Sequence, residues 1–190
     1  MFGDPNGESK HEKVKFSKCS SNLTKGPFGS DMKKSLYVDK SDSTYKVYLQ
    51  LNALQKDQSL GEYYISESYF KQKMFKYEVK PGDFIITCDG TLGEMLQLKE
   101  PMERGVISPS LMRVSLLNDK MNDRYFEALW KYYMLPVMAG QARNSCLMHL
   151  PSAKTLGAIE VPLPSLELQK VYSEFLEQSD KSKFVVENSG

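Results

Sequence analysis

The first half of the chain alternates apolar and polar residues, a pattern that predicts strands with one buried face. Residues 13–16 alternate weakly. Residues 45–51 alternate well, with the apolar set on one side: Tyr45, Val47, Leu49 and Leu51. Lys46, Tyr48 and Gln50 fall on the other side. We therefore expect two strands, each packed against a core through one face only.

A hairpin is predicted between residues 79 and 98. Pro81-Gly82 gives a turn, the apolar run 84–88 gives a strand, Asp89-Gly90 gives a second turn, and 96–98 resumes the strand pattern. Residues 106–117 are apolar again but contain Pro109, which has no N–H for a sheet ladder. This segment is therefore predicted to be a pair of strands or one bent strand.

Two internal helices are predicted from their first residues. Ser66 is a good N-cap for a short helix reaching about Lys73. Asn122 or Asp123 caps a second helix, which Pro136 is expected to end. That helix carries an apolar stripe at helical spacing: Phe126, Leu129, Trp130, Tyr133 and Met134. Such a stripe is more typical of a core than of a cofactor site.

A last helix follows a strand-like segment at 159–163. Ser165 is its expected N-cap, and it should run to about Ser182, roughly 27 Å at 1.5 Å per residue. Its apolar residues form one stripe: Leu168, Val171, Tyr172, Phe175 and Leu176. Periodicity alone does not decide whether this stripe packs on its own domain or on a partner. We predict a domain at 1–163 and a helical arm at 164–190.

The predicted fold class is α+β: a mixed, mostly antiparallel, β-rich domain with packed helices and a C-terminal helical arm. With 190 residues, 41% of them apolar and 26% charged, the chain can bury a core of its own. Cys19, Cys88 and Cys146 lie far apart without a CxxC pair, which argues against a disulfide framework and a zinc ribbon. No secretory signal and no membrane-spanning run is visible, so a cytoplasmic protein is expected.

Charge is unevenly distributed although the net charge is only +1. From residue 10 to residue 46, nine lysines stand against four acidic residues, a local charge of +5. In this segment a GPFGS loop at 26–30 is flanked by Lys25, Lys33 and Lys34. Exposed backbone N–H groups and lysines could together meet phosphates there. The alternative is an ordinary turn beside a solvated charged face.

Signals for catalysis are weak. The two histidines, His11 and His149, are not spaced as metal ligands, and no GxSxG or phosphate-binding loop is present. The dipeptide Asp89-Gly90 is typical of a hairpin turn, so Asp89 is interpreted as a turn residue rather than a catalytic carboxylate. A binding module is therefore favoured over an enzyme, and over a small β-rich nuclease in particular.

Six short motifs occur in an order that is informative. They are FGDP (2–5), GPFGS (26–30), YEVKPGDFIIT (77–87), GTLG (90–93), ISP (107–109) and VPLPSLELQ (161–169). In this order the chain resembles the specificity subunits of type I restriction-modification systems. The resemblance covers one target-recognition domain and the start of the conserved helix that follows it.

The resemblance implies a non-catalytic reader of double-stranded DNA that holds no cofactor itself. It implies recruitment of methyltransferase subunits, which use S-adenosylmethionine to methylate adenine, and nuclease subunits can join them. Together with the local charge, the family's use of loops predicts a set of DNA-binding residues: Lys25, Gly26, Ser30, Lys33, Lys34, Lys46, Thr87, Thr91, Arg143 and Asn144.

Full-length relatives carry two recognition domains and two helical spacers, whereas this chain has one of each. It is expected to be a half-length subunit, a silent-cassette fragment or a truncated form. If the stripe on the last helix pairs with a second copy, the resulting two-fold axis predicts an interrupted palindrome as the DNA site. The competing hypothesis is a regulatory fragment that binds methyltransferase subunits without reading DNA.

Overall fold

The computed structural model describes residues 11–141 and 149–187, with side chains for 11–140 and 149–178. Two sheets form the centre of the fold. One sheet is antiparallel throughout, and its strands, in spatial order, are β2 (Ser20–Lys25), β10 (Leu111–Leu116), β7 (Phe84–Thr87) and β8 (Met95–Gln97).

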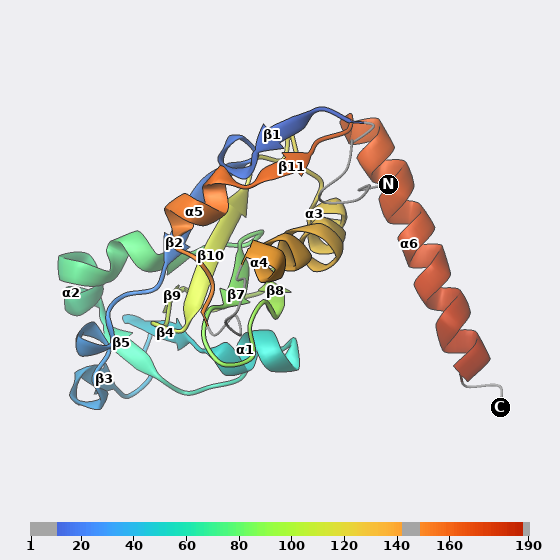
Figure 1. The fold of residues 1–190 in the computed structure, drawn as a ribbon. Helices are drawn as coiled ribbons and strands as arrows, with labels where there is room; N and C mark the ends of the chain where they lie inside the picture. The colour runs from blue at the N-terminus through green and yellow to red at the C-terminus, as the bar shows by residue number, and fades with distance from the viewer. Residues whose placement is uncertain (1–10, 142–148, 188–190) are drawn as a thin grey trace.

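The second sheet has five strands, and β4 and β9 pair in parallel within it. In spatial order they are β3 (Tyr37–Val38), β5 (Tyr64–Ser66), β4 (Thr44–Tyr48), β9 (Gly105–Ile107) and β6 (Glu78–Val79). A separate two-stranded ribbon joins β1 (Lys13–Lys15) to β11 (Glu160–Pro162) near the two ends of the domain (Figure 1).

The helices pack on both sides of the four-stranded sheet, and the last of them extends beyond it (Figure 1). They are α1 (Gln50–Gln55), α2 (Glu67–Tyr69), α3 (Asp123–Leu129), α4 (Leu135–Gln141), α5 (Ala153–Ala158) and α6 (Leu166–Glu187). A π-helical turn, Phe70–Met74, extends α2, and another, Trp130–Met134, joins α3 to α4. In Figure 1, α6 leaves the body as a long arm. No helix in the described part of the chain is long and apolar enough to span a membrane.

The four-stranded sheet separates two hydrophobic cores because its strands alternate. Ile86 and Met112 face the helices, in a core that includes Phe126 and Trp130. Ile85 and Leu111, the neighbouring residues, face the five-stranded sheet instead. The two inner strands, β7 and β10, are therefore buried on both sides over most of their length, which explains why β7 reads as a continuous apolar run.

Most of the predicted elements are present, and the α+β class is confirmed. Ser66 caps α2 and Asn122 caps α3, each accepting a backbone N–H three residues on. The hairpin is β7 and β8. The segment 106–117 is two strands that belong to different sheets, separated at Pro109. The five residues of the predicted stripe on α3 and its extension are all buried.

Three predictions about elements are corrected. The strand expected at 45–51 ends at Tyr48, and Gln50 starts α1, because the chain turns there into a helix. Pro136 does not end the helix: the π-helical turn before it already interrupts the regular hydrogen-bond ladder, so α4 continues to Gln141. Helix α5 was not anticipated, since its residues AKTLGA carry no clear apolar period.

Candidate nucleic-acid interface

Three loops meet at one end of the four-stranded sheet, which we call the loop end. Strand β2 ends there at Lys25, β7 ends at Thr87, and β10 begins at Leu111, because these antiparallel strands are paired in register. The loops at this end are residues 26–36, 88–94 and 108–110. They contain the GPFGS and GTLG motifs and the last two residues of the ISP motif, and Gly26 and Ser108 are 82 residues apart in the sequence.

Backbone hydrogen bonds hold these loops together. The N–H of Gly26 donates to the carbonyl of Leu111 at 2.8 Å, and the N–H of Cys88 donates to that of Ser110 at 2.8 Å. A Cβ on Gly26 would lie 2.0 Å from the carbonyl oxygen of Ser108. Glycine is therefore needed at this position for the GPFGS loop to approach the ISP loop closely.

The turn at 88–94 gains two partners from distant parts of the chain. The side chains of His149 and Asp89 form a hydrogen bond, with Nδ1 2.7 Å from Oδ1, and the two residues form an isolated β-bridge. The side-chain amide of Gln50 donates to the carbonyl of Asp89 at 2.8 Å. Sequence reasoning missed this group, because no local pattern connects residues 50, 89 and 149.

Five of the predicted DNA-binding residues lie in or beside the first loop: Lys25, Gly26, Ser30, Lys33 and Lys34. The three lysines are exposed, and none has a carboxylate partner among the described residues. Thr91 is exposed in the second loop. Arg143 and Asn144 lie outside the described residues. The structure thus places six of the predicted residues on adjoining loops.

Two of the predicted DNA-binding residues are buried in this structure. Lys46 is only 1% exposed, and its ammonium donates to the carbonyls of Gln58 at 3.0 Å and Ser59 at 2.7 Å. It lies on β4, between β5 and β9, where the loop at 58–61 covers the side that alternation had assigned to solvent. Thr87 is fully buried, and its hydroxyl donates to the carbonyl of Thr91 and so shapes the turn.

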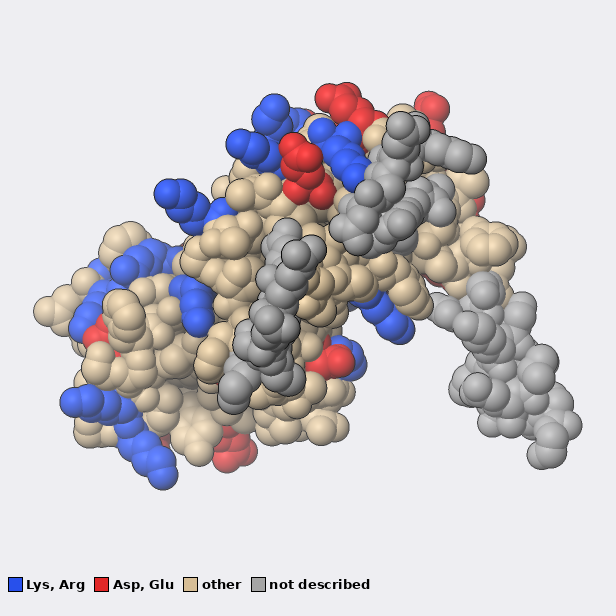
Figure 2. Space-filling view, viewed as in Figure 1, with Lys and Arg blue, Asp and Glu red and all other residues tan. Residues whose placement is uncertain are grey.

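The chemistry at the loop end favours binding. Cys88, the first residue of the 88–94 loop, is fully buried, and burial raises the pKa of its thiol to about 12, so it stays neutral and poorly nucleophilic. Among the residues described, no group of three or more His, Cys, Asp or Glu side chains is placed to hold a metal ion. In Figure 2, Lys and Arg side chains spread over the part of the body that carries β2, α2 and β3, with few acidic side chains among them.

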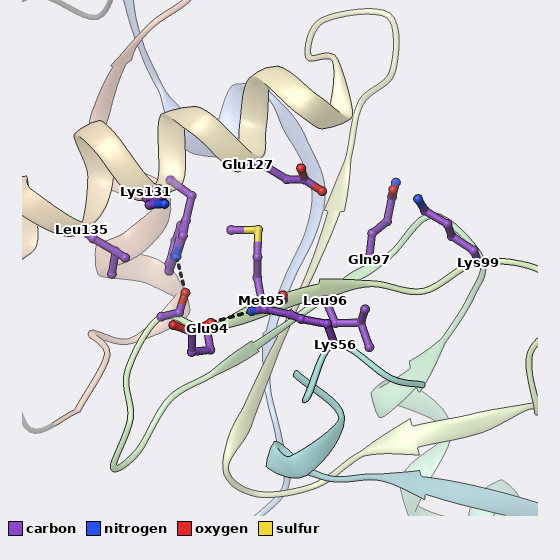
Figure 3. Close-up of a pocket in the computed structure, with 11 residues that line it drawn as sticks. Lys56, Glu94, Met95, Leu96, Gln97, Lys99, Glu127, Lys131 and Leu135 are labelled. Atoms are coloured by element: carbon purple, nitrogen blue, oxygen red, sulfur yellow. Dashed lines mark hydrogen bonds and ion pairs between the residues drawn. The ribbon is translucent and has the colours of Figure 1, made fainter. Parts of the chain in front are cut away.

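A cleft of about 460 Å³ lies behind the 88–94 turn, at the open edge of β8. In Figure 3, Met95 points from β8 toward helix α3, with Leu135 and Lys131 on the opposite wall. The indole N–H of Trp130 donates to the carbonyl of Gly93 at 2.8 Å, and Lys56 pairs with Glu94 at 2.5 Å. These two contacts hold the 88–94 turn in place on the side that faces the cleft.

A polar joint fixes the start of α6 to the domain. Gln169 is fully buried: its amide donates to the carbonyls of Lys120 and Pro164, both at 2.9 Å, and its oxygen accepts the N–H of Asn122 at 2.8 Å. Ser173 donates to the Asn122 side chain at 3.0 Å. The same Asn122 oxygen caps α3, so one side chain serves both helices.

The predicted stripe on α6 divides into two faces. Tyr172 and Leu176 pack on the helical core, and the Tyr172 ring makes an edge contact with Tyr125 at 6.2 Å. Leu168, Val171 and Phe175 are 39%, 60% and 65% exposed. Two residues of the predicted stripe therefore contact the domain itself, because the first turns of α6 pack against α3, and the other three are exposed.

Solved structures with a similar fold include chains from type I restriction-modification systems. A chain from a structure describing complex assembly and conformational transition of the type I R-M system matches with a TM-score of 0.70 and 14% identity, over 99% of this chain and 43% of that chain. The HsdS subunit from Thermoanaerobacter tengcongensis matches with a TM-score of 0.69 and 14% identity, over 99% and 42%.

A third structure, the type I restriction-modification S subunit from M. genitalium, matches with a TM-score of 0.53 and 16% identity, over 95% of this chain and 42% of that chain. This chain therefore spans less than half the length of the solved chains it matches. No curated protein sequence matches it significantly.

The sequence itself matches a protein family described as the type I restriction modification DNA specificity domain, over residues 29–189. That match includes the 88–94 and 108–110 loops of the loop end, the joint and most of the arm. Since it extends over most of the chain, the chain belongs to the type I restriction-modification DNA specificity domain family.

Proposed function

We propose that the chain reads double-stranded DNA through the loop end and directs methyltransferase subunits to that site. The observation that carries this proposal is the convergence of three loops at one end of the sheet, where the first loop presents exposed lysines that have no carboxylate partner among the described residues. Lysines without carboxylate partners are available to replace the counterions of phosphates. Family membership supports DNA as the target, and the action of the chain is expected in the cytoplasm, where DNA is accessible.

In this proposal the chain has no catalytic role. Adenine methylation would be carried out by the methyltransferase subunits with S-adenosylmethionine, and nuclease subunits would join the same assembly. The domain at 1–163 would recognise one half-site, and the arm at 164–190 would set its distance from the other. The exposed face of α6, Leu168, Val171 and Phe175, is available for a second copy of the chain or for another subunit.

The test is a comparison of salt dependence between two double variants. Lys33→Ala with Lys34→Ala removes two charges at the loop end. Lys80→Ala with Lys99→Ala removes two exposed charges at the opposite end of the same sheet, where β7 begins and β8 ends. We expect the first pair to flatten the plot of log K against log salt by about 0.9 per lost phosphate contact, and the second to leave it unchanged.

Equal effects of the two pairs would show that the lysines act only through net charge, and the loop end would lose its role. No binding by the wild-type chain to any duplex at low salt would favour the regulatory fragment that does not read DNA. Sequencing of methylated adenines in cells that express the chain with its methyltransferase would then identify the site, if one exists.

A further inference from the structure

The most exposed large apolar side chain in the described part of the protein is Phe28, at 80%. It lies in the middle of the GPFGS loop, between Pro27, which is buried, and Gly29, which is exposed. Single exposed apolar residues are common on protein surfaces, so exposure alone assigns nothing to Phe28. What distinguishes it is how the loop is held and what surrounds the ring.

The loop that carries Phe28 is anchored on both sides. On one side, Gly26 is bonded to Leu111 and packed against Ser108. On the other side, Asp31 binds two groups of the segment 67–74: its carbonyl accepts the Tyr69 hydroxyl at 2.9 Å, and its carboxylate pairs with Lys73 at 2.5 Å.

Within the loop, the carbonyl of Phe28 accepts the N–H of Asp31 at 2.8 Å, which closes a tight turn directly after the ring. Met32 is buried and pins the far side of the turn in the core. The backbone of Phe28 is thus fixed while its ring has no protein contact that would bury it. A fixed backbone reduces the entropy lost when such a ring binds a partner.

The loop that carries the ring is flanked by lysines in the sequence. Lys25 precedes the loop, and Lys33 and Lys34 follow it. The acidic residue in the loop, Asp31, is already paired with Lys73. One exposed aromatic ring on a loop flanked by lysines that have no carboxylate partner among the described residues is a poor match for an apolar protein surface, which needs a larger contiguous patch. It matches a polyanion whose charged backbone flanks apolar ring faces and methyl groups, as in a nucleic acid.

We propose that Phe28 makes an apolar contact with a base of the bound DNA and contributes sequence preference, while the neighbouring lysines supply contacts to phosphates. This inference rests on the proposed function. Apolar side chains contribute to base recognition by contacting the thymine methyl group in the major groove or by wedging between base steps. A base contact carries no phosphate charge, so it changes affinity without changing the salt slope.

The experiment uses the full chain and two duplexes: one selected by the wild-type chain from a randomised library, and one of random sequence. Phe28→Ala is compared with Phe75→Ala, a matched control that removes an equally large ring of 61% exposure from a different part of the surface, the 75–77 turn. Thermal melting checks that both variants stay folded. We expect them to do so because both rings are exposed and contribute little to the core.

We expect Phe28→Ala to weaken binding to the selected duplex about tenfold or more, with an unchanged salt slope and unchanged binding to random duplex. Phe75→Ala should bind both duplexes like the wild type. Enhanced fluorescence of 2-aminopurine in the selected duplex, seen with the wild type and lost in Phe28→Ala, would support the wedge form of this contact.

Wild-type affinity of Phe28→Ala for the selected duplex would overturn the inference and leave the proposed function intact. So would an equal loss on both duplexes, because a base contact must discriminate. If the wild-type chain binds neither duplex, so that no selected duplex is obtained, the proposed function fails first, and the two failures are therefore distinguishable.

Discussion

The loop end and the joint at the start of α6 both contain polar residues, but these residues differ in burial and in whether they have partners within the protein. At the joint, Gln169 is fully buried and its amide makes three hydrogen bonds. At the loop end, Lys33 and Lys34 are exposed and have no carboxylate partner among the described residues. A satisfied, buried polar group stabilises one arrangement of the chain, whereas an exposed and unpaired one is available to a ligand.

Two lysines of the same basic segment show the same contrast between an exposed and a buried polar side chain. Lys33 and Lys46 both belong to the basic segment at 10–46, and their residue type gives no hint of a difference. Lys46 is buried, with its ammonium bonded to two carbonyls and 3.5 Å from Glu103. The local charge of +5 therefore overstates the charge that a DNA backbone would meet.

The largest expected effect comes from Lys46→Ala. It leaves the carbonyls of Gln58 and Ser59 without this donor, and Glu103 keeps Lys40 as its ion-pair partner. Removing one partner from a buried charged network typically destabilises by about 3 kcal/mol. Chemical denaturation should show this loss, while Lys33→Ala should change the free energy of unfolding by less than about 0.5 kcal/mol.

The comparison would fail if Lys46→Ala were as stable as the wild type and bound DNA with a flatter salt slope. Lys46 would then belong with the lysines of the loop end, and the burial seen in this structure would have to open when DNA binds.

A smaller loss of stability is expected for Gln169→Ala, because the joint connects the arm to the domain without belonging to the central sheet. The change leaves the carbonyls of Lys120 and Pro164 and the N–H of Asn122 without this partner. We expect about 2 kcal/mol, felt mainly as weaker docking of α6. Amide exchange should rise in the first turns of α6 and stay unchanged in β7 and β10.

Lys170→Ala, at the exposed neighbouring position, is the matched control for the joint and should leave amide exchange in α6 as it is. Uniform acceleration of exchange across the whole domain in Gln169→Ala would mean that the joint supports the entire fold and not the arm alone.

The smallest effect on folding is expected from the double change Leu168→Glu with Phe175→Glu, since both side chains are largely exposed. If the exposed face of α6 pairs with a second copy, light scattering over a range of concentrations should show a dimer for the wild type and a monomer for the variant. At concentrations low enough for the wild type to be monomeric as well, the two melting temperatures should be nearly equal.

Lys170→Glu serves here as a control, because it adds an acidic side chain to α6 outside the exposed apolar face. A wild-type chain that remains monomeric both alone and with its methyltransferase would rule out a symmetric dimer. A methylated site with two different halves would do the same, because a two-fold axis requires identical, inverted half-sites.

Local patterns in the sequence were sufficient for much of the fold. Ser66 and Asn122 were identified as N-caps, and Ser165 also accepts a backbone N–H at the start of α6, from Leu168 at 3.4 Å. The hairpin of β7 and β8 and the aromatic stripe of α3 were predicted correctly. Each of these features depends on residues within a few positions of one another, so turn chemistry and periodicity encode them directly.

Tertiary structure decided which polar residues are exposed. The alternation at 45–48 shows which side chains are apolar, but the burial of Lys46 depends on the loop at 58–61 and on Glu103. The pairing of Asp89 with His149 and the closeness of Gly26 to Ser108 join segments 60 and 82 residues apart. Likewise, α3 covers only one side of α6, so one apolar stripe became a docked face and an exposed face. The sequence determines the local elements, but coverage by distant segments exists only once the chain has packed.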